Sequence, residues 1–174
     1  MTTIPCFIAC SLISVVFPVC HAATLGGKVV SVADGDTVTV LDVVNVQHKI
    51  RVSGIDAPEK KQAFGERSRQ SMVRMVSGKH VRVEWDKRDK YGRLIGKILV
   101  AQENCQTDCC PKDIDAGLAQ IALGLAWHYK KYKREQAPVD RNTYAQTEAG
   151  AQAKKVGLWS EVNPVSPWNF RRNK

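Results

Sequence analysis

The sequence predicts an α+β domain that is built on a closed five-stranded β-barrel and carries three α-helices. Short alternating apolar runs dominate the chain from Leu25 onward, whereas apolar residues at helical spacing occur in three later segments. The length of 174 residues and the hydrophobic content of 44% fit one domain with a buried core. Because a closed barrel leaves no exposed sheet edge, it is the architecture we expect for five short strands.

Five strands are expected from the apolar pattern. In the first three, an apolar side chain recurs at every second position, which is typical of a strand with one buried face. Asp34-Gly35 supplies the turn between the first two strands, and the polar segment 86–92 supplies the loop between the last two. The expected strands lie around residues 30–32, 38–40 and 46–52, and at residues 80–85 and 93–100.

Three helices are expected between and after these strands. The first covers residues 64–76, where apolar side chains recur at helical spacing and Gly78 can end the helix. The second covers residues 114–127. The third covers residues 138–159, with a proline near its start and a glycine near its end.

The first 22 residues are expected to form a signal peptide. They contain no charged side chain, and their apolar run at 7–17 is too short to cross a bilayer as a helix. Cys20 and Ala22 are small residues suited to a cut after Ala22, which leaves a domain at residues 23–174 with a basic C-terminal tail. There are two alternatives for this segment. One is a lipoprotein signal in which Cys20 is acylated, and the other is a buried N-terminal strand. We expect an exported monomer, periplasmic or extracellular, without stable membrane association.

Three cysteines remain after such a cut, at Cys105, Cys109 and Cys110. An oxidising compartment permits one disulfide among them and leaves one odd thiol, and the sequence does not choose the pair. Zinc binding is the alternative, but it requires a fourth ligand and no histidine lies nearby in sequence. We therefore expect a disulfide that closes a loop.

The charge balance favours a polyanionic partner. The chain has 26 Lys and Arg against 17 Asp and Glu, a formal net charge of +9. Nucleic acid and an anionic membrane surface both fit this charge, so the motifs must decide between them.

Two acidic motifs could form a cation site. "DGDTV" places Asp36 at the start of the second strand, and "GIDAPE" places Asp56 and Glu59 just past the third. Adjacent strands can bring these ends together, so Asp36, Asp56 and a backbone carbonyl near Ala57 could bind a hard cation such as calcium. Two carboxylates do not fill its coordination shell, so water or a substrate phosphate would complete it, as in a catalytic metal site. Taken alone, an Asp-Gly pair is more often only a turn.

Five short motifs occur in the order seen in the staphylococcal (micrococcal) nuclease family, over roughly residues 26–161. They are "DGDTV", "RVSGIDAPE", "DKYGR", "GLAW" and "AQAKKVGLWSE". The chain resembles this family. The resemblance implies an OB-type barrel and calcium-dependent cleavage of DNA and RNA that leaves 3′-phosphate and 5′-hydroxyl ends.

The resemblance also implies roles for individual residues. Asp36, Asp56 and the main-chain oxygen of Ala57 would bind calcium. Members of the family often have threonine at the position of Ala57. Glu59 would either orient or deprotonate the attacking water. The catalytic residues implied are Arg51, Glu59 and Arg93, with both arginines contacting the phosphate.

Substrate contacts are expected from the loop between the last two strands and from the segment 127–134. That segment alternates aromatic and basic residues, which can stack on bases and attract phosphates. The residues implied are Lys90, Tyr91, Trp127 and Tyr129. A noncatalytic OB-type nucleic-acid-binding module is the alternative function, but a binder has no need of acids that face the phosphate.

Overall fold

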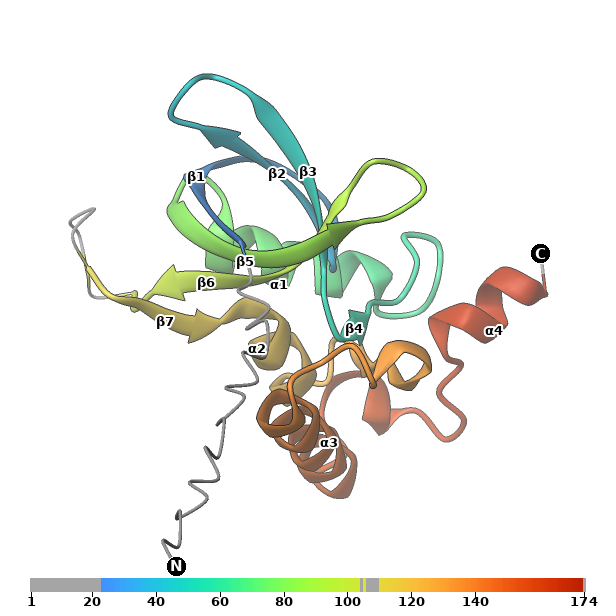
Figure 1. Cartoon of the computed structure of the whole chain (residues 1–174). Coiled ribbons are helices and arrows are strands. Elements are labelled where there is room, and N and C mark those ends of the chain that lie inside the picture. The colour runs from blue at the N-terminus through green and yellow to red at the C-terminus, as the bar shows by residue number, and fades with distance from the viewer. Residues whose placement is uncertain (1–22, 104, 106–109, 174) are drawn as a thin grey trace, which may run out of the picture.

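The computed structural model describes residues 23–103, 105 and 110–173, and its centre is a closed barrel (Figure 1). Strand β1 pairs with β2 and with β5, β2 pairs with β3, and β5 pairs with β6, all antiparallel. A parallel pairing of β3 with β6 closes the ring. This confirms the predicted five-stranded OB-type barrel. The barrel strands are β1 (Ala23–Asp34), β2 (Thr37–Asp42), β3 (Gln47–Val52), β5 (His80–Arg88) and β6 (Leu94–Ala101).

The barrel interior is filled by the side chains that alternate along these strands. Helix α1 (Gly65–Val76) adds Met72 and Val76 to the same core, so it covers one side of the barrel. Gly78 follows its C-terminal end with φ of 72°, as the sequence predicted. Burial of each such side chain contributes about 1.5–3 kcal/mol to stability. The fully buried barrel residues include Val29, Val38, Val40, Ile50, Val52, Val81, Val83, Leu94 and Ile98.

The second helix is much shorter than predicted. Helix α2 covers only Ala116–Ala122, because Asp115 caps its start and Gly124, with φ of 62°, turns the chain after its end. The predicted segment 114–127 also includes residues of two short strands, and periodicity alone cannot separate a short apolar strand from a helix. These strands are β7 (Lys112–Asp115), which pairs antiparallel with β6, and β8 (Trp127–His128), which pairs with β4 (Ile55–Asp56).

The third helix also ends earlier than predicted. Helix α3 covers Pro138–Ala153, because the positive φ angles of Lys155 and Gly157 break the helical path. The 3₁₀ turn η2 (Gly157–Ser160) lies three residues beyond α3, where the prediction had continued the same helix. Helix α4 (Pro167–Arg172) was not predicted, and it lies in the segment expected to be a basic tail.

Gly124 is expected to be a strong stability determinant. It has a positive φ, a Cβ there would meet the backbone of Val156 and Gly157, and its carbonyl accepts from the Leu158 N–H at 2.8 Å. Gly124→Ala should therefore lower the free energy of unfolding by about 2 kcal/mol or more, measured by urea denaturation. Gly150→Ala is the control, because Gly150 is helical with open space around it and should be neutral or stabilising. Equal effects at both positions would contradict this account.

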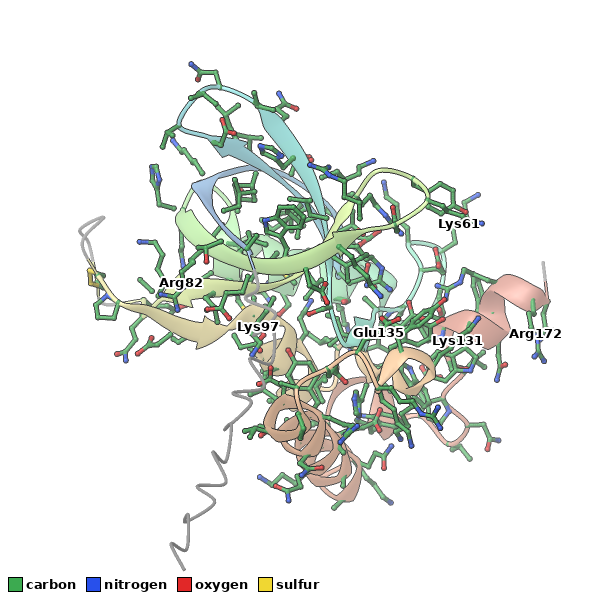
Figure 2. The ribbon with its side chains drawn as sticks, viewed as in Figure 1. Lys61, Arg82, Lys97, Lys131, Glu135 and Arg172 are labelled. Carbon is green, nitrogen blue, oxygen red and sulfur yellow. A yellow bond between two sulfur atoms is a disulfide. The ribbon has the colours of Figure 1, made fainter. Side chains whose placement is uncertain are left out.

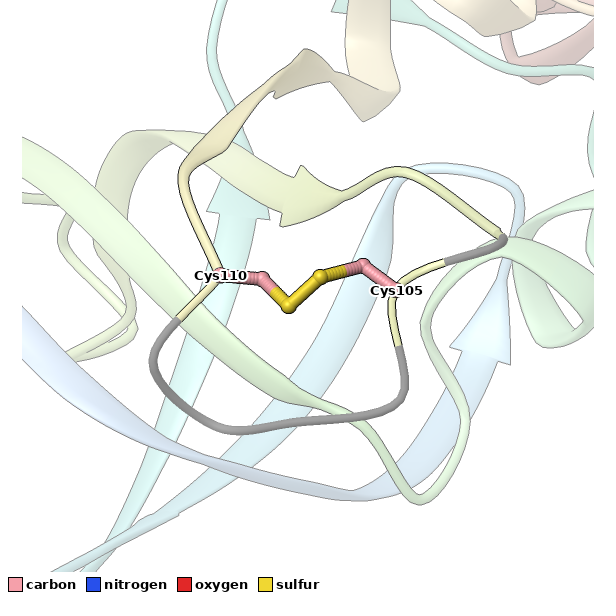
Figure 3. The surroundings of a disulfide bond; sticks show 2 residues. All are labelled: Cys105 and Cys110. Atoms are coloured by element: carbon pink, nitrogen blue, oxygen red, sulfur yellow. A yellow bond between two sulfur atoms is a disulfide. The ribbon is translucent and has the colours of Figure 1, made fainter.

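The cysteine loop contains the expected disulfide. Cys105 and Cys110 are bonded, with 6.2 Å between their Cα atoms (Figure 3). Neither sulfur is therefore a thiolate available to zinc, and Cys109 lies outside the described residues. The expected signal peptide lies outside them too. Within the described ranges, no helix is long and apolar enough to span a membrane.

Candidate active site

Asp36 is positioned by the tight turn between β1 and β2. The turn can pack directly against α1 because residue 35 is glycine. A Cβ at this position would collide with Ser68 and Ala57. Gln120 of α2 fixes this arrangement, because its Nε2 donates to the carbonyls of Gly35 at 3.1 Å and Ser68 at 2.9 Å. Asp36 is therefore held in a buried position. The sequence analysis missed Gln120, whose only signal was a polar side chain within an apolar helix.

Asp56 is positioned by the short β4–β8 pair. It lies opposite Trp127 in the register of this pair, and the Gly54 carbonyl accepts from the Tyr129 N–H at 2.9 Å. The side chain of Asp56 is only 1% exposed. Strand β8 thereby fixes the depth at which this carboxylate sits.

Arg51 on β3 joins the two buried carboxylates. Its Nη1 lies 2.8 Å from Asp36 Oδ2, and its Nη2 donates to Asp56 Oδ1 at 2.8 Å. The Ala57 N–H also donates to Asp36 Oδ2, at 2.7 Å. The structure therefore brings together four residues that the sequence placed at one site, namely Asp36, Arg51, Asp56 and Ala57.

The electrostatics of this group favour additional positive charge. Burial raises the pKa of Asp36 to about 7, and the nearby carboxylates of Asp34 and Asp56 add to the effect of burial, whereas Arg51 opposes it. A raised pKa means that the ionised form of Asp36 is destabilised by its surroundings. A cation bound beside Asp36 would stabilise this ionised form. The available donors are all oxygens, which suits calcium.

The donor set fits calcium only if water or substrate completes it. Among the residues that the structure describes, no cluster of three or more His, Cys, Asp or Glu side chains is arranged to hold a metal. Asp36 and Asp56 are two carboxylates beside an open cleft, to which the main-chain oxygen of Ala57 could add a third donor. This composition fits a catalytic site with open coordination positions more closely than a closed structural site.

Glu59 lies in the same cleft and contacts an arginine that was not predicted. Its Oε1 lies 2.7 Å from Nη1 of Arg171, and Nη2 of Arg171 lies 2.8 Å from Asp56 Oδ2. The hydrogen bond to Asp56 raises the pKa of Arg171 above its usual range, against the opposing effect of burial. Arg171 comes from α4, whose sequence "PWNFRR" has a helix-starting proline but no feature that indicates which arginine turns inward.

A cleft of about 1010 Å³ surrounds this group and extends to the β5–β6 loop. Arg93, Lys90 and Tyr91 line this cleft, and their contact with substrate stays a prediction. Arg93 donates through Nε to Asp89 Oδ2 at 2.7 Å, and its guanidinium lies 5.5 Å from the centre of the Tyr91 ring. Although burial opposes it, the hydrogen bonds from Arg93 lower the pKa of Asp89. Arg93 is thus held within the loop, apart from the carboxylates that Arg51 joins.

The two predicted aromatic residues have different surroundings. Tyr129 lines the cleft, and its ring centre lies 5.7 Å from that of Trp168 on α4. Trp127 does not line it. Its ring centre lies 4.3 Å from that of Trp159 and 5.5 Å from that of Trp168, and it borders a separate cavity of about 670 Å³. A role of Trp127 in substrate binding stays a prediction.

Comparison with protein families identifies the group to which this arrangement belongs. The family model described as "Staphylococcal nuclease homologue" matches residues 49–161. The chain belongs to the staphylococcal nuclease family. The matched range of this nuclease family contains Arg51, Asp56, Glu59 and Arg93, whereas Asp36 and α4 lie outside it.

Relatives from several bacteria cover most of the chain. It is 36% identical over 151 residues to a micrococcal nuclease of Shigella flexneri, covering 86% of this chain and 82% of that protein. It is 35% identical over 161 residues to an uncharacterized endonuclease of Haemophilus influenzae, covering 92% and 81%. It is 41% identical over 150 residues to the protein ParB of Escherichia coli, covering 86% and 81%. The nuclease family and the first two names support an endonuclease activity.

Proposed function

We propose that the chain is a calcium-dependent endonuclease that hydrolyses DNA and RNA and leaves 3′-phosphate and 5′-hydroxyl ends. One observation carries this proposal most directly. A single guanidinium, that of Arg51, bridges two buried carboxylates in a cleft that also contains Glu59. Such a cluster combines a cation site, a phosphate contact and a proton acceptor within the reach of one phosphodiester.

Asp36, Asp56 and the Ala57 carbonyl would hold calcium, which when bound supplies positive charge to a phosphate oxygen. Arg51 already spans the two carboxylates, so its guanidinium is oriented beside the position that the phosphate would take. Its N–H groups would stabilise the negative charge that develops on the phosphate oxygens during attack. Arg93 would approach the same phosphate from the β5–β6 loop.

Glu59 would act on the attacking water. Its side chain is 34% exposed, so water can reach it, while Asp56 is too buried to serve the same role. Glu59 would accept a proton from this water, or orient it, so that the water oxygen attacks phosphorus. The bond from phosphorus to the 5′-oxygen of the next nucleotide would then break, and that oxygen would take up a proton from solvent to become the 5′-hydroxyl. Phosphate-ester hydrolysis needs its barrier lowered by ~20 kcal/mol in total. General-base action contributes only about 10²- to 10⁴-fold of this, so charge stabilisation must supply much of the rest.

The flanking nucleotides would contact the cleft walls. Tyr129 could stack on a base, and Lys90 and Tyr91 could contact the chain beyond the scissile phosphate. The alternative, a noncatalytic nucleic-acid-binding module, is disfavoured by the buried acids of the cleft. Those acids would repel the phosphates that a pure binder must attract.

We further propose that the protein is exported as a monomer after a cut behind Ala22. Strand β1 begins at Ala23, so this cut would remove no residue of the described fold. The intact mass of the exported protein tests this proposal. A mass that begins at Met1 would contradict it.

Product analysis tests the proposed reaction. Single-stranded DNA and RNA oligonucleotides of the same sequence should both be cut in the presence of calcium. Their fragments should carry 3′-phosphate and 5′-hydroxyl ends, identified by mass spectrometry before and after phosphatase treatment. Fragments with 5′-phosphate ends, or cleavage of DNA alone, would contradict the proposed chemistry.

A further inference from the structure

Arg171 occupies the acidic end of the cleft. The carboxylate of Asp56 is shared between two arginines. Arg51 contacts Oδ1 at 2.8 Å, whereas Arg171 contacts Oδ2 at 2.8 Å and Oδ1 at 3.3 Å. The second Nη of Arg171 reaches Glu59, so one guanidinium spans the proposed metal ligand and the proposed water-activating residue. Arg171 is separated from Asp56 by 115 positions in the sequence. The contact therefore depends entirely on where α4 docks.

Helix α4 docks against the domain through one aromatic side chain and the segment before it. Trp168 packs against Tyr129 and Trp127, and Gln62 Nε2 donates to the Val165 carbonyl at 2.5 Å. Figure 1 shows α4 at the edge of the molecule, away from the barrel strands. Figure 2 shows Arg172 on this same helix. No residue of α4 belongs to the barrel core, so release of α4 would leave that core intact.

The side chain of Arg171 is already partly hydrated in this position, so its release into water would change its solvation only modestly. It is 42% exposed, whereas Asp56 beneath it is 1% exposed. Release of Arg171 would leave Asp56 as a buried anion that has lost one of its two cationic partners. A buried anion in this state favours the binding of another cation.

We propose that Arg171 is an internal cation that competes with calcium for Asp56 and Glu59, so that metal binding displaces Arg171. This inference rests on the proposed function. Calcium approaches its oxygen ligands to about 2.3–2.6 Å. A guanidinium 2.8 Å from the same Asp56 oxygen would face a dication at short range, and like charges so placed repel each other. One cation must give way to the other.

The charge count agrees with exchange. Asp36, Asp56 and Glu59 carry three negative charges when ionised, against which Arg51 and Arg171 supply two positive charges. Calcium in place of Arg171 would bring the same group to neutrality. The apparent dissociation constant for calcium then equals the intrinsic value divided by the fraction of molecules in which Arg171 is released. Removal of Arg171 should raise that fraction to one.

Calcium titration by calorimetry, without nucleic acid, tests this competition on the whole domain. Arg171→Gln should bind calcium about tenfold or more tightly than the parent protein, because no internal cation has to be displaced. Arg172→Gln is the matched control. It removes the same charge from the next position of α4, but among the described residues the Arg172 side chain has no hydrogen-bond or ion-pair partner, whereas Arg171 pairs with Asp56 and Glu59. Its affinity should stay within about twofold of the parent, because only the general field changes.

A second variant separates helix docking from the loss of one side chain. Trp168→Ala removes the ring that packs on Tyr129 and Trp127, so it should loosen α4 and also tighten calcium binding. Thermal unfolding of each variant confirms that the barrel is intact.

Three outcomes would overturn the competition. They are unchanged affinity in both Arg171→Gln and Trp168→Ala, weaker binding in Arg171→Gln, and equal tightening in Arg172→Gln. If calcium drives cleavage while the affinities are unchanged, the inference about Arg171 fails and the proposed function stands. If no variant binds calcium and cleavage does not need it, both fail.

Discussion

Replacing Glu59 by glutamine is expected to lower the turnover of single-stranded DNA by a factor of about 10² to 10⁴. Glutamine keeps the size and a hydrogen-bonding group of the side chain, but it cannot accept a proton from water at neutral pH. Substrate affinity, measured without turnover, should weaken less, since Glu59 is not expected to hold the phosphate. The measurement is kcat at saturating substrate and calcium.

Glu135→Gln is the matched control for the loss of one negative charge. Glu135 lines the same cleft and forms an ion pair with a basic side chain, Lys87, as Glu59 does with Arg171. Turnover should stay within a few-fold of the parent. If both variants lose the same activity, the effect belongs to the field of the cleft, and Glu59 has no specific part in the reaction.

Replacing Arg93 by lysine is expected to lower turnover at least ~10²-fold, equivalent to about 2.7 kcal/mol of transition-state stabilisation. Lysine keeps the positive charge but loses the planar pair of N–H donors that can contact two phosphate oxygens. Because these contacts strengthen as negative charge builds on the phosphate, catalysis should suffer far more than binding. In the structure, the Arg93 guanidinium pairs with Asp89, which orients it within the cleft wall.

Arg88→Lys provides the comparison at the end of β5, where the same loop begins. Arg88 also lines the cleft, but its guanidinium donates to the Gly92 carbonyl and is not assigned to the phosphate. This variant should keep turnover within a few-fold of the parent. Circular dichroism and thermal unfolding check that both variants are folded. An Arg93→Lys protein that is folded and as active as Arg88→Lys would remove Arg93 from the proposed catalytic group.

The barrel could be predicted because its signal is local. In strand β3, buried Ile50 and Val52 alternate with more exposed neighbours, which is the period-two pattern that the sequence displays directly. Helix α2 could be predicted only in part. Its apolar run continues into Trp127, and only the φ of Gly124 and the pairing of β8 with β4 show that this residue belongs to a strand.

The candidate site could likewise be predicted only in part. The proximity of Asp36 to Asp56 follows from the adjacency of short strands, and the motif resemblance indicated which residues to expect there. Arg171 gave no such signal, because its contacts with Asp56 and Glu59 join positions more than a hundred residues apart. Gln120 is similar, since its bond to Gly35 depends on how α2 packs against the β1–β2 turn.

The dependence of cleavage on calcium tests the central claim most directly. The purified domain, residues 23–174, is incubated with single-stranded DNA in calcium, then in excess chelator, and then with calcium restored. Chelation should abolish cleavage and restored calcium should recover it, because the carboxylates of Asp36 and Asp56 cannot by themselves stabilise the negative charge that develops on phosphate. Full activity in chelator would contradict the assignment of these carboxylates as a metal site.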